Sequence, residues 1–152
     1  MLNIRPLIYG KPIKRLMTAL VGALLLQCSP VIRAETAIAV VTSKNSPLTP
    51  LSREEVADLF LGKNRSSHEI PVKPLDNKDS TLRERFYTAA ANMSAIRVKA
   101  YWSRIVFSGQ GRPPQEIASS EVQATLASER DALTYLPVDQ VTGDMKILFR
   151  IP

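Results

Sequence analysis

The sequence is poor in the residues that build metal and redox sites. Its 152 residues include one cysteine, Cys28, and one histidine, His68. A single histidine in a polar loop, without cysteines or carboxylates at ligand spacing, does not make a metal site. From residue 35 onward the chain has no cysteine, so disulfides and thiol chemistry are excluded there. We therefore expect no metal and no cofactor.

Acidic side chains are absent from the first 34 residues. Five of the 20 basic residues precede Glu35, which is the first of 14 acidic residues. The formal charge of +6 therefore falls to +1 from residue 35 onward, where fifteen basic side chains face fourteen acidic ones. Nucleic-acid binding needs basic charge concentrated on the folded domain. This composition excludes a nucleic-acid partner.

No uncharged run is long enough to span a membrane. Residues 16–26 form an apolar stretch of eleven residues behind a basic segment, and Ile32, Arg33 and Ala34 resemble a cleavage site. This order is typical of a secretory signal, whereas a membrane-spanning helix needs roughly 20 apolar residues. The bulky Gln27 argues against lipid attachment at Cys28. We expect a cleaved signal over 1–34, a single domain over 35–152, a periplasmic or secreted location, and no stable membrane insertion after cleavage.

Hydrophobic spacing and caps predict the elements of that domain. Ser52 and Glu55 form a capping box before a helix that Gly62 ends. Apolar residues at helical spacing predict further helices from Ser80, from Ser94 and from a second capping box formed by Ser120 and Gln123. The expected strands are residues 35–42, 70–75, 132–136 and 145–151, with 70–75 at an edge or strand end because of its two prolines. The order predicts a layered α/β sandwich.

The aromatic pair Tyr101 and Trp102 allows two interpretations. It can form a platform for a ligand, or it can pack in the core beside Val98 and Ile105. The helical spacing of these four residues favours the core.

Several segments resemble a known family. They are LSREEVADLFLGK (51–63), PVKPLD (71–76), STLRERFY (80–87), YWSR (101–104) and FSGQGRPPQ (107–115). Together they are similar to the substrate-binding proteins of bacterial phosphate transporters, and most of all to short exported proteins of that kind. The resemblance implies a fold like one lobe of a type II periplasmic binding protein. The chain departs from the family at 77–81 (NKDST), where full-length phosphate binders have a glycine-rich Asp-Gly-Ser-Gly-Thr loop.

Candidate ligand-binding residues follow from strand ends and helix starts. Ligands of open α/β sheets bind at the carboxyl ends of strands, and free amides at a helix N-terminus attract anions. These arguments select the hydroxyls of Thr42, Ser43, Ser80 and Thr81, with Arg83 adding positive charge. Helix capping alone also explains Ser80 and Thr81.

No catalytic residues are expected. The chain lacks a nucleophile elbow of the G-x-S-x-G kind, and the adjacent Glu54 and Glu55 diverge on their helix. We predict an exported, non-enzymatic solute-binding-like protein for phosphate or a similar small oxyanion, linked to ABC-type phosphate uptake through a permease. The alternative is a ligand-free periplasmic interaction or accessory module on the same fold.

Overall fold

The computed structural model describes residues 36–152. The export signal expected over residues 1–34, and Cys28 within it, lie outside the described residues. No helix in residues 36–152 combines the length and apolar character needed to cross a bilayer.

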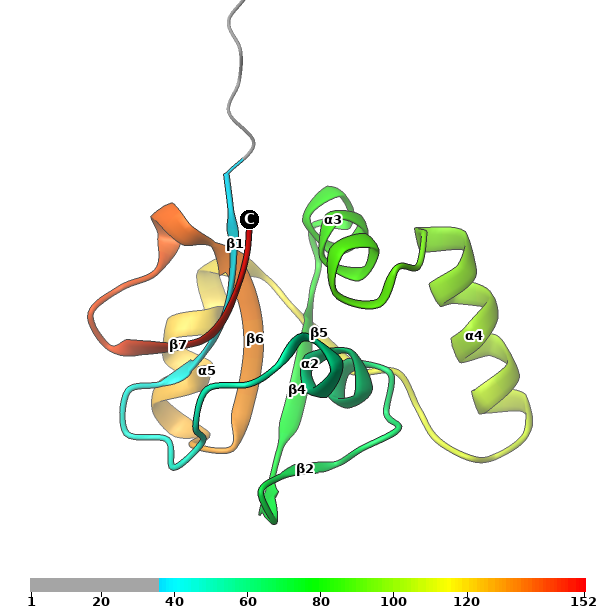
Figure 1. The fold of residues 1–152 in the computed structure, drawn as a ribbon, viewed down its shortest axis with the longest axis horizontal. Helices are drawn as coiled ribbons and strands as arrows, with labels where there is room; N and C mark the ends of the chain where they lie inside the picture. Colours follow the sequence, from blue (N-terminus) through cyan, green and yellow to red (C-terminus); the bar gives the residue numbers. More distant parts are fainter. Residues whose placement is uncertain (1–35) are drawn as a thin grey trace, which may run out of the picture. The chain divides into compact units, whose positions relative to one another are not determined.

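A mixed five-stranded sheet is the centre of the fold (Figure 1). Its strands are β1 (Ile38–Ser43), β4 (Lys73–Asn77), β5 (Gln115–Ile117), β6 (Ala132–Pro137) and β7 (Met145–Ile151). They lie in the order β5-β4-β6-β1-β7. β4 is parallel to β5 and to β6, whereas β1 is antiparallel to both of its neighbours, β6 and β7. The predicted α/β class is confirmed. The strand directions determine which strand ends lie at the same edge of the sheet.

Alternate residues of the central strands face two different apolar layers. Val40 and Tyr135 are paired across β1 and β6 and belong to one buried cluster, while Ala39 and Leu136 are paired and belong to the other. This is the period of two that a strand imposes on its side chains. Because both faces are covered, β1 is buried along its whole length.

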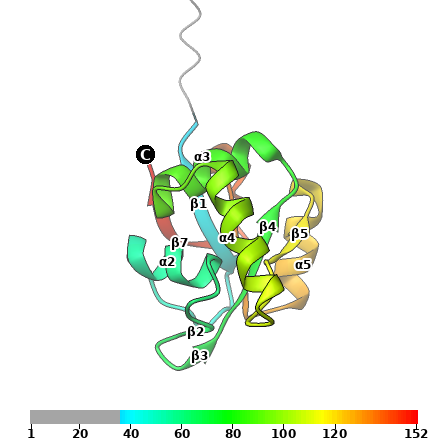
Figure 2. The same cartoon turned by 90° about the vertical axis from the view of Figure 1, so that its right-hand side faces the viewer.

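Helices cover the two faces unequally. α2 (Arg53–Phe60), α3 (Ser80–Ala91) and α4 (Ala95–Phe107) contribute to the cluster on one face, and α5 (Val122–Ser128) contributes to the cluster on the other (Figure 1). α4 lies farthest from the sheet and packs inward through Val98 and Trp102; Figure 2 shows it in front of the other elements. One side of α4 therefore stays exposed.

The local signals for helix ends are confirmed at α2. The Ser52 side chain accepts from the Glu55 amide at 3.2 Å, and the Glu55 carboxylate accepts from the Ser52 amide at 2.7 Å. Gly62, just beyond the helix, has φ +65°, the left-handed conformation that glycine adopts readily. α3 and α4 begin where the pattern predicts, although the N-cap of α3 is Asp79 rather than Ser80.

Four expectations about local structure need correction. A hairpin of β2 (Ser66–Ser67) and β3 (Ile70–Pro71) precedes β4, so the predicted strand 70–75 is divided. β4 is interior to the sheet and not an edge. The strand-end alternative is confirmed, since Pro71 ends β3 and Pro74 stands next to the first residue of β4, where a missing N–H is tolerated. The short strand β5 was not predicted. The Glu121 carboxylate, not Gln123, caps the turn before α5 by accepting from the Ala118 amide at 2.8 Å.

Candidate functional site

A carboxylate of the chain itself caps the turn between β4 and α3. The Asp79 carboxylate accepts from the amides of Thr81 (2.9 Å) and Leu82 (3.1 Å). The Asn77 side chain accepts from the Asp79 amide at 2.9 Å, so the turn is closed by internal hydrogen bonds. Two of the first-turn amides expected to be free for a ligand are therefore occupied, because Asp79 supplies the negative charge that a helix N-terminus attracts.

Residues 77–81 in this turn contain no glycine, and their backbone conformation reflects this. Among residues 36–152, the non-glycine positions with positive φ are His68, Glu69 and Asn92, and none falls within 77–81. The turn thus forms from ordinary backbone conformations, and a side-chain carboxylate stands at the N-cap. The first-turn hydroxyls of Ser80 and Thr81 are exposed to solvent.

Thr42 and Ser43 lie at the opposite end of the sheet from Ser80 and Thr81. Thr42 is paired with Leu133, and Leu133 is paired with Pro74 at the start of β4, whereas Ser80 follows the end of β4. The four hydroxyls do not form one site because β1 runs antiparallel to β6, which is parallel to β4. The Thr42 hydroxyl is buried and donates to the Ala132 carbonyl at 2.8 Å. Ser43 is also buried.

Arg83, a further candidate, lines a cavity. It forms an ion pair with Glu116 on β5. Both side chains border a recess of about 520 Å³, called the Asp76 recess below because Asp76 also lines it. Apolar residues make up much of the remaining wall, with Glu84 and Lys99 beside them.

Asp76 is the only buried acidic or basic residue within residues 36–152. Its side chain is buried and accepts hydrogen bonds from the hydroxyls of Tyr135 and Tyr87, the latter at 3.2 Å, and from the Asn77 amide at 3.0 Å. Burial raises the pKa of the Asp76 carboxyl, although the Tyr135 hydrogen bond acts in the opposite direction. Burial and the nearby Asp76 also raise the pKa of both tyrosines. This arrangement holds β4, α3 and β6 together.

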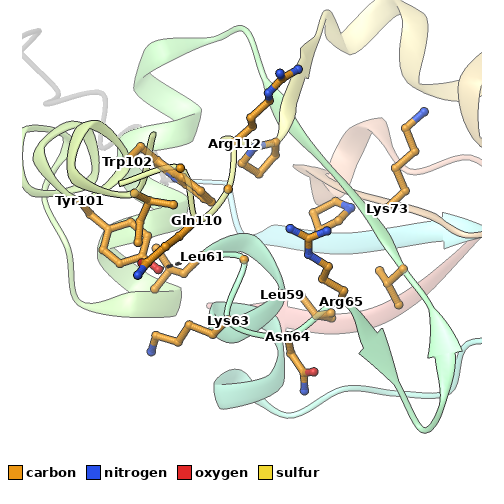
Figure 3. A pocket seen from close by; sticks show the side chains of 17 residues that line it. Leu59, Leu61, Lys63, Asn64, Arg65, Lys73, Tyr101, Trp102, Gln110 and Arg112 are labelled. Atoms are coloured by element: carbon orange, nitrogen blue, oxygen red, sulfur yellow. Dashed lines mark hydrogen bonds between the residues drawn. The ribbon is translucent and has the colours of Figure 1, made fainter. Parts of the chain in front are cut away.

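A larger pocket, called the basic pocket below, lacks the carboxylates that line the Asp76 recess. Its volume is about 770 Å³, and it lies between the end of α2, β4, α4 and the loop 109–114. None of its lining residues is acidic. Four are cationic: Lys63, Arg65, Lys73 and Arg112. Figure 3 shows the Arg65 guanidinium lying among the lining side chains, whereas the side chains of Arg112, Lys63 and Lys73 start at the rim and extend outward.

The four cations differ in how they are neutralised. Lys63 pairs with Asp58 at 3.1 Å, and Lys73 pairs with Glu129 at 2.7 Å. Within residues 36–152, neither Arg65 nor Arg112 has a carboxylate at salt-bridge distance. Two guanidinium groups, each with a planar set of donors suited to an oxyanion, are therefore available at this pocket.

Aromatic side chains fix one wall of the basic pocket. Trp102 is buried and packs against Gly62, and the Tyr101 hydroxyl donates to the Leu61 carbonyl at 2.8 Å. The interpretation of Trp102 as a core residue is confirmed, since it belongs to the buried cluster with Val98, and Ile105 packs against that cluster. Its indole N–H is buried and has no hydrogen-bond partner.

The sequence arguments did not select Asp76, Arg65 or Arg112. The sequence pattern places Asp76 in a polar loop before a helix, and its burial could not be predicted because Tyr87 and Tyr135 contact it only in the folded structure. The acid-free run 85–115 does not mark the basic pocket either, because Arg112 is the only one of the pocket's four cations that lies in it. The described residues contain no group of three metal-ligating side chains, and His68 lies in the turn of the β2–β3 hairpin.

Comparisons with known proteins support the fold. A Clostridium perfringens protein assigned to the phosphate ABC transporter substrate-binding proteins, solved with bound phosphate, superposes with a TM-score of 0.57 at 17% identity. An ABC-type phosphate transport receptor from Vibrio cholerae gives a TM-score of 0.57 at 14% identity. Each match covers 74% of this chain and 45% of the other. The chain shares the fold of part of these two structures.

The match confirms the resemblance in architecture and also defines its extent. The chain spans less than half the length of either binding protein, which agrees with the predicted single lobe. No protein-family model matches the sequence, and no curated protein matches it. At these identities the likeness concerns the fold, and the ligand must be argued from this chain's own residues.

Proposed function

We propose that this protein is an exported, non-catalytic solute-binding-like protein that binds phosphate or a similar small oxyanion in the basic pocket. The observation that carries the proposal is a cavity of about 770 Å³ bordered by four cations and no carboxylate. A periplasmic location and an ABC permease as partner are part of the proposal. They are supported by the order of residues 1–34 and by the fold shared with phosphate transport proteins.

Arg65 and Arg112 are the expected primary contacts. Neither is neutralised by a carboxylate among residues 36–152, so an incoming anion does not have to displace a partner. Charge-assisted hydrogen bonds of this kind contribute about 1.5–3 kcal/mol each. The pocket is open to solvent, so a bound anion stays partly hydrated, and weak binding, roughly in the millimolar range, is expected.

The α3 N-terminus is a competing location for the same ligand. Ser80, Thr81 and the helix dipole favour an anion there, and the bound Asp79 carboxylate opposes it. The two locations can be separated by substitution, because they are formed by different residues. Thr42 and Ser43 contribute to neither, since they are buried at the other end of the sheet.

Calorimetric titration with phosphate, sulfate and small carboxylates tests the proposal. The pair Arg65→Ala and Arg112→Ala should abolish phosphate binding, whereas Ser80→Ala with Thr81→Val should leave it unchanged. Lys44→Ala with Arg130→Ala removes two exposed cations elsewhere and serves as the charge-matched control. Loss of binding only in the Ser80 and Thr81 variant would move the site to α3. No heat with phosphate or sulfate at millimolar concentration would end the ligand proposal.

A ligand-free interaction module is the second candidate function. Asp79 occupies the amides at the start of α3, and the chain matches less than half the length of the phosphate transport neighbours. Both observations favour a protein that has this fold but binds no small ligand. The same titration decides between the two functions.

A further inference from the structure

The outer side of α4 carries the most exposed apolar residues of the described chain. Ile96 is 82% exposed and Phe107 is 91% exposed. They are eleven residues apart, which is three turns of an α-helix, so they lie on one face with Ala100 and Ser103 between them. The buried Val98 and Trp102 are on the opposite face. We call this exposed row the α4 stripe.

Cations border the α4 stripe on both flanks. The helical period places Arg97 and Arg104 along one flank and Lys99 along the other. Arg104 lies over the Tyr101 ring, 5.8 Å from its centre, and Arg97 donates to the Asn92 carbonyl at 3.4 Å. Within residues 36–152, none of these three cations forms a salt bridge. α4 itself contains no acidic residue.

A shallow groove runs beside the stripe on the arginine flank. Its volume is about 520 Å³, and Lys63, Arg97 and Arg104 line it together with five uncharged residues. No carboxylate borders it. The groove therefore offers a recess for an anionic group directly beside exposed apolar side chains.

We propose that the outer side of α4 docks on the surface of a bilayer that contains anionic phospholipid. The pattern is that of an interfacial helix, which places apolar side chains among the acyl chains while flanking cations meet the headgroups. Ile96 and Phe107 enter the interface, and a headgroup phosphate occupies the groove beside Arg97 and Arg104. This docking is peripheral and does not depend on the proposed ligand of the basic pocket.

A bilayer accounts for this surface better than an acidic protein does. α4 is the outermost helix on its side of the sheet (Figures 1 and 2). Ile96 and Phe107 on this helix are almost fully exposed. A flat, deformable partner can contact such a surface along its length. A protein partner would have to supply a complementary concave site that is both apolar and acidic.

Vesicle sedimentation tests the proposal, with phosphatidylcholine vesicles prepared with and without phosphatidylglycerol at low ionic strength. The wild-type protein should bind only the vesicles that contain phosphatidylglycerol, and added salt should release it. Arg97→Gln with Arg104→Gln should weaken partitioning by roughly tenfold or more. Ile96→Ser with Phe107→Ser should weaken it as well, because the apolar contact is lost.

Lys44→Gln with Arg130→Gln is the matched control and should bind as the wild type does. All variants share the same N-terminal segment, so differences between them report on α4 alone. Thermal melting confirms that each variant is folded; the substituted side chains are exposed, and melting temperatures close to wild type are expected. The proposal fails if the wild type does not bind anionic vesicles, if it binds phosphatidylcholine equally well, or if the α4 variants bind like the control.

Discussion

Gly62 stands against Trp102 so closely that a Cβ at residue 62 would lie 2.9 Å from the indole Cη2 atom. Gly62 also has φ +65°. The turn that ends α2 and the indole that anchors α4 therefore depend on the same glycine. This contact positions Leu61 and Lys63 beside the aromatic wall of the basic pocket.

Gly62→Ala should destabilise the protein by about 1–3 kcal/mol from backbone strain, with a further loss because the indole must move. Gly109→Ala is the matched control, since Gly109 has φ +71° but no atom within 4 Å of its Cβ position. Chemical denaturation of both variants separates the two effects. Equal losses in the two variants would show that the Trp102 contact adds nothing.

Trp102→Ala should lower the free energy of unfolding by about 3–5 kcal/mol, the range for emptying an aromatic core site. Trp102→Phe should cost less, because it keeps a ring in the core and removes an indole N–H that has no partner. Thermal melting of both variants measures the difference. An unchanged melting temperature for Trp102→Ala would contradict the core assignment and revive the ligand-platform interpretation.

Asp76 should make stability fall as pH rises. Burial holds its folded pKa above the unfolded value of about 3.9. Between those two pH values the native state binds more protons than the unfolded state, so the free energy of unfolding decreases with pH. The wild type minus Asp76→Asn difference in unfolding free energy should therefore shrink from pH 4 upward. Urea denaturation across this range measures it.

Glu55 provides the control of opposite sign. The hydrogen bond from the Ser52 amide lowers the pKa of Glu55, so its contribution is present above the unfolded pKa and lost as pH falls. The wild type minus Glu55→Gln difference should thus grow with pH. A parallel trend for Asp76 and Glu55 would show that the burial of Asp76 does not control its ionisation.

These residues also show which features of the fold could be predicted from the sequence and which could not. The capping box at Ser52 and the turn at Gly62 depend on neighbours within a few positions, so the pattern predicted both correctly. Asp76 and Tyr135 are 59 residues apart and meet only because β4 pairs with β6. The separation of Thr42 and Ser80 could not be predicted for the same reason, since strand direction in a mixed sheet is set by pairing that no local pattern records. The fold class followed from the order of elements, whereas the candidate pocket required three-dimensional structure.

Removing the Asp79 carboxylate should create an anion site that the wild type lacks. Asp79→Gly frees the amides of Thr81 and Leu82, at a capping cost of only a few tenths of a kcal/mol. Asp79→Asn keeps a neutral oxygen on those amides and is the matched control. The released N-terminus of α3 can then combine its dipole with the Ser80 and Thr81 hydroxyls to hold phosphate.

Thermal melting with and without phosphate measures the effect. At a phosphate concentration of about ten times the Kd of the new site, Asp79→Gly should gain about 1.4 kcal/mol of stability beyond Asp79→Asn. Any binding in the basic pocket is common to both variants and cancels in this difference. An equal gain in Asp79→Gly and Asp79→Asn would mean that these two amides are not what separates this chain from a phosphate-binding loop. A larger gain in Asp79→Gly would identify the resident carboxylate as the group that excludes phosphate from the start of α3.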